Sequence, residues 1–276
     1  MPVDAAVQRS TRYLSGAADV RLAVHTWEPA NGSARGTAFY IHGIQSHAGW
    51  LHETGPQLAA RGITVTALDR RGSGESGGAR GDLESADAVF DDYRRAFDQI
   101  DEAGPVVAVG QSFGGSVMAG LLVNDLIAPD RVVFCAPALG QQRLRHDADA
   151  LAAIRGDKTG ERVFLGFTDD QYTTDSVHLR WIANDPLMIR SITARTRATM
   201  VEIEDTYWDA DDVVSDAILV HPRTDSIIDT AAAGHVLQRL SGAVHRVVLP
   251  TDAHYIEFSE ARDDYLAIIA GALEQV

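Results

Sequence analysis

The chain has 276 residues, of which 45% are hydrophobic, so it can bury a sizeable core and intrinsic disorder is excluded as a description of the whole chain. Its net charge of −15 disfavours nucleic acid and anionic membrane surfaces as partners. The one cysteine, Cys135, excludes an intrachain disulfide and a cysteine-based metal cluster. No apolar run reaches the length of a membrane span and residues 1–16 lack a signal-peptide pattern, so we expect a cytoplasmic protein.

Short apolar runs rich in β-branched residues alternate with helical patterns along the chain, which predicts the α/β class with a mostly parallel central sheet flanked by helices. Apolar residues at three- and four-residue steps predict helices over 89–100 and 112–126. Residues 30–36 have the composition of a hairpin loop. The strands are expected at Arg21–Trp27, Thr37–His42, Ile63–Asp69, Val106–Gly110, Arg131–Ala136, Ala217–His221 and Val244–Leu249.

The alternation of strand and helix patterns stops after Gly140, because no clear strand follows until Ala217. The interval is dense in charged residues and contains scattered aromatics. We interpret residues 141–212 as a helical cap inserted between two parts of one core, 1–140 and 213–276. Its aromatic residues could line an apolar pocket or pack the insert onto the core. Trp181 and Tyr207 are kept as candidate substrate contacts, although packing is the commoner role of such side chains.

The strongest local signal is Gly110-Gln111-Ser112-Phe113-Gly114, which fits G-x-S-x-G and lies between an apolar strand pattern and a helical one. A serine on such a sharp strand-to-helix turn is exposed to substrate, and the glycines leave room for the neighbouring chain. The first N–H groups of the following helix have no internal partner. We therefore predict Ser112 as a nucleophile and the Phe113 N–H as an oxyanion donor.

An acid and then a histidine should follow such a serine in chain order, because the hydroxyl needs a base and the base needs an orienting carboxylate. Asp225 and His254 each come just past an expected strand and are predicted to fill these roles. Asp229 remains an alternative acid, although helix capping explains it adequately. His221 and His245 lie within or at the end of expected strands and are interpreted as structural.

The loop after the strand ending at His42 is expected to provide a second oxyanion donor, the Ile44 N–H. In the same loop Gln45 and His47 are candidate substrate contacts. The glycine-rich turn of dinucleotide and phosphate sites does not occur near Gly43. We expect no cofactor and no metal in the reaction.

These motifs together resemble the α/β-hydrolase superfamily, in its lysophospholipase and monoacylglycerol-lipase-like (serine aminopeptidase-type) branch, over nearly the whole chain. The resemblance implies ester hydrolysis beneath a helical cap, and no catalytic role is given to Asp69 or Arg71. The residues that carry it are His42-Gly43, Asp69–Ser76, Gly110–Gly115, Ala136–Leu139 and Asn184–Leu187.

The sequence therefore predicts a serine hydrolase that cleaves a small-molecule carboxylic ester or thioester through an acyl-enzyme. An acyltransferase, a cyclase or a tailoring thioesterase would use the same Ser-His-Asp triad and differ only in the acyl acceptor. A ligand-binding protein without turnover is a third possibility, which the complete triad argues against. The sequence gives no prediction for the oligomeric state.

Overall fold

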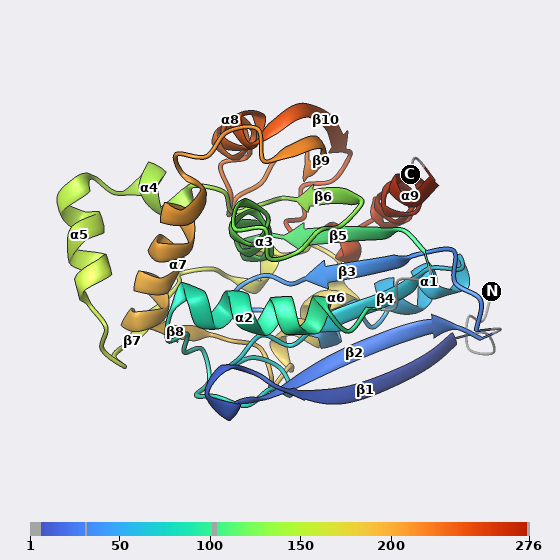
Figure 1. The fold of residues 1–276 in the computed structure, drawn as a ribbon, viewed down its shortest axis with the longest axis horizontal. Helices are drawn as coiled ribbons and strands as arrows, with labels where there is room; N and C mark the ends of the chain where they lie inside the picture. Colours follow the sequence, from blue (N-terminus) through green and yellow to red (C-terminus); the bar gives the residue numbers. More distant parts are fainter. Residues whose placement is uncertain (1–6, 31, 101–103, 275–276) are drawn as a thin grey trace.

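The computed structural model describes residues 7–30, 32–100 and 104–274, in which an eight-stranded sheet carries helices on both faces (Figure 1). The strand order is β1-β2-β4-β3-β5-β6-β9-β10; the pairs β1–β2 and β2–β4 are antiparallel and all the others are parallel. The fold class is confirmed as α/β. The strands are β1 Val7–Ser15, β2 Arg21–Pro29, β3 Thr37–Ile41, β4 Thr64–Leu68, β5 Val106–Gln111, β6 Arg131–Cys135, β9 Val214–Pro222 and β10 Ser241–Leu249.

Two apolar layers hold the helices to the sheet, because successive side chains of a strand point to opposite faces. In β3, Phe39 and Ile41 belong to the apolar layer that contains residues of α2, α3 and α8, whereas Ala38 and Tyr40 belong to the layer that contains residues of α1 and α9. The central strands are therefore buried on both faces. These helices are α1 Thr54–Ala60, α2 Ala86–Phe97, α3 Phe113–Val123, α8 Thr230–Leu240 and α9 Arg262–Glu274, joined by 3₁₀ turns η1 Ala17–Asp19, η2 Ala48–Leu51 and η4 Ile256–Phe258.

The segment between β6 and β9, residues 141–212, is called the insert below and extends to one side of the sheet (Figure 1). It contains mainly helices, as expected, but also two short antiparallel strands that the sequence analysis missed. Three-residue strands carry too little alternation to be recognised from pattern alone. The elements of the insert are α4 Gln141–Arg145, α5 Ala148–Gly156, β7 Arg162–Phe164, η3 Asp169–Gln171, α6 Ser176–Ala183, β8 Ser191–Thr193 and α7 Ala194–Tyr207.

Each strand expected from the sequence is present, with ends displaced by up to three residues, but two details were wrong. β1 was missed because its side chains are mostly exposed and polar, so it lacks an apolar pattern. Residues 30–36 were expected to form a hairpin loop, yet β4 lies between β2 and β3, so this segment is a crossover. The hairpin lies one connection earlier, between β1 and β2. In the described part of the chain, no helix is both long and apolar enough to cross a bilayer.

Candidate active site

Ser112 is the residue at which buried strand β5 turns into helix α3. Its backbone angles are φ +53° and ψ −122°, a strained conformation for a residue with a side chain. The turn is held from both sides, because the Ser112 N–H donates to the Cys135 carbonyl (3.0 Å) and its own carbonyl accepts from the Ala138 N–H (2.8 Å). The strain is thus supported by the neighbouring strand β6 and the loop that follows it.

Two glycines make this turn sterically possible. A Cβ on Gly114 would lie 1.9 Å from the carbonyl oxygen of Ile41, and one on Gly110 would lie 2.8 Å from the Cα of Gly115. Both approaches are to backbone atoms, which cannot rotate away. The spacing G-x-S-x-G therefore reflects close packing of α3 against β3 and β5.

His254 and Asp225 meet at the same edge of the sheet, because each follows the carboxyl end of one of the adjacent parallel strands β10 and β9. The His254 Nδ1–H donates to Asp225 Oδ2 at 2.8 Å, and both side chains are almost fully buried. This bond leaves Nε2 as the basic nitrogen of the ring. Burial tends to raise the pKa of Asp225, but the charge and hydrogen bond of His254 and the N–H groups of Ile227 and Ile228 hold that pKa below its ordinary value.

The competing residues have other partners. The Asp229 carboxylate accepts from the Ala232 N–H at 3.0 Å and so caps α8. His221 contacts the Pro222 carbonyl through Nδ1 at 2.8 Å, and His245 is largely exposed on β10. Among the candidates from the sequence, the structure joins His254 to Asp225.

The loop after β3 passes directly over the Ser112 turn. A Cβ on Gly43 would lie 2.7 Å from Gln111 Oε1, 3.2 Å from the Tyr255 hydroxyl and 3.3 Å from the Ser112 Cβ. The loop, the turn and the segment after His254 converge here, and a side chain at this position would displace at least one of its neighbours. The Gly43–Ile44 peptide is therefore a close neighbour of Ser112.

Arg70, which the sequence analysis did not single out, holds the loop after β3 through hydrogen bonds to its backbone carbonyls. Its guanidinium donates to the carbonyls of His42 (3.3 Å), Gly43 (3.2 Å) and Ile44 (2.9 Å). Because a trans peptide is planar with its C=O and N–H pointing in opposite directions, the bond to the Gly43 carbonyl turns the Ile44 N–H away from Arg70. Arg70 also lies over the Phe113 ring, 5.2 Å from its centroid, so it touches both predicted oxyanion-donor residues.

His42 completes the support of the loop. Its Nε2 accepts from the Arg70 N–H (3.1 Å) and its Nδ1 donates to the Gly43 carbonyl (2.8 Å). Burial, together with the positive charge of Arg70, lowers the pKa of His42 to about 3. A neutral imidazole can accept at one nitrogen and donate at the other, which is the state these two bonds require.

The insert covers this edge of the sheet. The Tyr172 carbonyl accepts from the Tyr255 N–H (2.9 Å), and the Tyr172 ring lies 6.0 Å from that of His254. The Gln45 carbonyl likewise accepts from the Ile189 N–H at 2.8 Å. Ser112 is 7% exposed and His254 is 1% exposed, so both residues are nearly inaccessible to solvent beneath this cover.

The four candidate substrate contacts are all engaged with protein groups. The Gln45 side chain accepts from the Tyr172 hydroxyl, and His47 Nε2 lies 3.0 Å from Asp185 Oδ2. Both side chains thereby join the loop after β3 to the insert. Asp185 belongs to the Asn184–Leu187 motif of the family resemblance, and this motif was the feature of the sequence from which the partner of His47 could have been predicted.

The two aromatic candidates both belong to the insert, Trp181 to α6 and Tyr207 to α7. Trp181 packs edge-on against Trp50 and stacks on His52, with centroid distances of 5.7 and 4.7 Å. Tyr207 is fully buried, and its hydroxyl bonds Ser116 (2.8 Å) and the Gly140 N–H (3.1 Å). Tyr207 thus ties α7 to α3, the packing role that the sequence analysis left open.

Comparisons with known proteins agree with this architecture. A family model described as "Serine aminopeptidase, S33" matches residues 32–260. The chain is 32% identical over 113 residues to the monoacylglycerol lipase of Mycolicibacterium smegmatis, a match that spans only 40% of each protein.

Solved structures extend the likeness to the whole fold. A soluble variant of monoglyceride lipase from Saccharomyces cerevisiae, in complex with a substrate analog, superposes with a TM-score of 0.83 at 15% identity, covering 100% of this chain and 97% of that one. A thermostable carboxyl esterase from Bacillus coagulans gives 0.77 at 16% identity, covering 97% and 99%. At such identities the superpositions establish the fold.

Proposed function

Because the chain belongs to the serine aminopeptidase S33 family of α/β-hydrolases, in its monoacylglycerol-lipase-like branch, we propose that it hydrolyses carboxylic esters with Ser112 as nucleophile. The observation that carries the proposal is the 2.8 Å bond between His254 and Asp225, at the sheet edge that also holds the strained Ser112 turn. Monoacylglycerols are the first substrates to test, since the relatives in sequence and structure are lipases for them.

In the proposed mechanism, the Ser112 Oγ attacks the ester carbonyl carbon while His254 Nε2 accepts the hydroxyl proton. Asp225 keeps Nδ1 protonated and stabilises the imidazolium that forms. The carbonyl oxygen becomes an oxyanion between the N–H groups of Phe113 and Ile44, which Arg70 and the start of α3 hold in place. The tetrahedral intermediate expels the alcohol, to which His254 returns the proton.

The second half of the cycle repeats these roles with water. His254 takes a proton from water as its oxygen attacks the acyl-enzyme, and the collapse of the second intermediate releases the carboxylic acid and restores Ser112. Residues 141–212 are proposed to act as the cap, since Tyr172 of this segment lies close to His254 and donates to Gln45 of the loop after β3. Expulsion of bulk water strengthens each hydrogen bond to the oxyanion.

The test is hydrolysis of a panel of monoacylglycerols and p-nitrophenyl esters of increasing chain length, with aminoacyl p-nitroanilides as the peptidase counterpart. The proposal expects esters to be cleaved and anilides to be poor substrates. Ser112→Ala should lower kcat by about 10⁶-fold, as removal of a triad serine does elsewhere. Ester hydrolysis that persists in Ser112→Ala contradicts the assignment.

Product analysis in the presence of added glycerol separates hydrolysis from acyl transfer. Free fatty acid as the main product supports water as the acceptor. If acylglycerols dominate, the protein is an acyltransferase that uses the same acyl-enzyme.

A further inference from the structure

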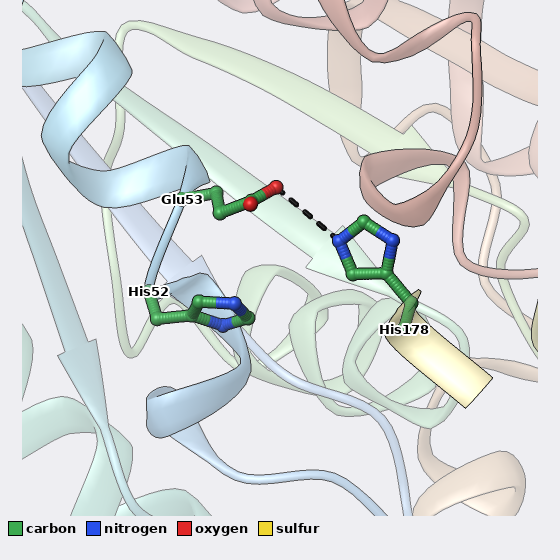
Figure 2. A group of neighbouring side chains, drawn as sticks. All are labelled: His52, Glu53 and His178. Atoms are coloured by element: carbon green, nitrogen blue, oxygen red, sulfur yellow. Dashed lines mark hydrogen bonds and ion pairs between the residues drawn. The ribbon is translucent and has the colours of Figure 1, made fainter. Parts of the chain in front are cut away.

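Three side chains that take no part in the proposed reaction converge where α6 of the insert meets the start of α1. His52, Glu53 and His178 each offer a ligand atom, and these atoms all lie within 4.8 Å of one another. Figure 2 shows both imidazole rings and the carboxylate turned toward one gap, with His178 reaching in from the insert. Two nitrogens and one carboxylate oxygen form a donor set that zinc accepts in proteins.

The His178 ring is held as a metal-binding histidine needs to be held. Its Nδ1 lies 2.8 Å from Asp175 Oδ1, and its Nε2 faces Glu53 Oε2 at 3.3 Å. Asp175 is itself fixed, because the same oxygen accepts from the N–H groups of Val177 and His178 and caps α6. A carboxylate on Nδ1 fixes the tautomer that presents Nε2 to a metal ion.

Stacking fixes the orientation of both rings. The His178 ring stacks on Phe258 at 4.5 Å with an interplanar angle of 15°, and the His52 ring stacks on Trp181 at 4.7 Å and 24°. Little side-chain freedom remains to be lost when an ion binds.

Glu53 has a second charged partner and borders a hollow in the surface. Glu53 Oε2 also accepts from the Arg262 guanidinium, so this carboxylate is held at the gap and its charge is partly shared. His52 and Glu53 also line a hollow of about 360 Å³, together with Arg9.

From this geometry we propose that His52, Glu53 and His178 form a binding site for a divalent transition-metal ion such as Zn²⁺, with water as the remaining ligand. Zinc sites with three protein ligands and water use this pattern. Binding of the ion to His178 Nε2 replaces the contact of this nitrogen with Glu53 Oε2. Because His178 belongs to the insert and Glu53 to the core, the ion would clamp α6 to α1, independently of the ester chemistry.

The test is calorimetric titration of tag-free, chelator-treated full-length protein with Zn²⁺ at neutral pH. We expect one equivalent to bind, and Tm to rise by roughly 5 °C at a 100-fold excess over Kd. His178→Ala should abolish this binding and the Tm rise, whereas His245→Ala, which removes an exposed histidine on β10, should keep both. Asp175→Ser retains a helix-capping side chain and should weaken binding by about 10- to 100-fold.

Tm measured in chelator reports whether each variant folds, so a loss of binding is not confused with unfolding. Absence of a stoichiometric Zn²⁺ site in the wild-type protein overturns the proposal. So does binding that His178→Ala leaves intact or that His245→Ala removes, since the ion would then lie elsewhere on the surface. Ester hydrolysis is not part of any of these readouts, so the outcome is separate from that of the proposed function.

Discussion

The carboxyl edge of the sheet and the insert hold their polar side chains in different ways. At the sheet edge, Asp225 and Arg70 are buried and are fixed largely by backbone groups: two N–H donors for the carboxylate and three carbonyls for the guanidinium. These backbone partners belong to the loops that directly follow β3 and β9, so their positions depend on the ends of two buried strands. The geometry proposed for catalysis is therefore built into the rigid part of the fold.

In the insert, many of the polar contacts are ion pairs between partly exposed side chains. Asp205 pairs with Arg143 (2.5 Å) and Arg155 (2.7 Å), and Arg190 pairs with Asp169. Exposed pairs of this kind contribute about 0–1 kcal/mol each. These ion pairs are therefore individually weaker than the contacts that hold Asp225 and Arg70, which agrees with the proposed role of the insert as a cap.

After Ser112 itself, the largest effect on kcat is expected for the acid, Asp225. Asp225→Asn should lower kcat by about 10⁴-fold, because an amide cannot keep His254 in the tautomer with Nε2 as base. Asp229→Asn is the matched control: asparagine also caps helices well, so kcat should stay near the wild-type value. The reverse pattern in steady-state ester kinetics would make Asp229 the acid.

A smaller effect on kcat is expected for Arg70, which holds the loop after β3. Arg70→Lys keeps the charge but loses the planar fork that reaches three carbonyls. We expect kcat to fall by about 10- to 100-fold with little change in KM, since the Ile44 N–H acts on the transition state. Arg35→Lys, at an arginine that also donates to a carbonyl, should change neither constant. A rise in KM alone would show that Arg70 serves substrate binding instead.

Glu204 is an exception within the insert, because this buried carboxylate is held, like Asp225, by backbone N–H groups, those of Gln142 and Arg143. Burial raises the pKa of Glu204 to about 7, above its unfolded value. The contribution of Glu204 to the free energy of unfolding is therefore fully present below about pH 4.3 and is lost as pH rises through about 7, on the order of 3–4 kcal/mol in all. Denaturant unfolding from pH 4 to 8 should show this loss, and Glu204→Gln should lack it.

A neighbour on the same helix provides the control for that change. Glu202→Gln also removes one charge from α7, so the pH dependence specific to Glu204 is the difference between the two variants. Equal profiles for both variants would mean that Glu204 is not the titrating group.

The smallest effect is expected for an ion pair of the insert. Arg155→Ala removes one partner of Asp205, with side chains 36% and 31% exposed, and should lower the free energy of unfolding by less than about 1 kcal/mol. Denaturant unfolding measures this change. A loss of several kcal/mol would mean that the insert is anchored as firmly as the sheet edge.

Much of the fold was predictable because the central strands are buried on both faces and read as apolar runs. The turn at Ser112 was predictable too, since its glycines are required by backbone contacts. β1 was not, because an edge strand with exposed polar side chains has no apolar pattern. The pairing of β2 with β4 depends on long-range contacts that a local loop pattern does not report.

Site residues that come directly after a strand could be predicted from the sequence. Residues whose role depends on contacts with distant parts of the chain could not. Asp225 and His254 were placed by their position after strands, and the structure joins them. Arg70 was missed because its role comes from reaching three carbonyls across the chain. The substrate contact proposed for Tyr207 rested on residue type alone, which does not distinguish a pocket wall from a buried tie between helices.

Covalent labelling tests the central claim most directly. The protein should react with a fluorophosphonate to give one adduct by intact mass, and peptide mapping should place that adduct on Ser112. Ser112→Ala should remain unlabelled while keeping the wild-type Tm. An unlabelled wild-type protein, or an adduct that Ser112→Ala retains, would contradict the account.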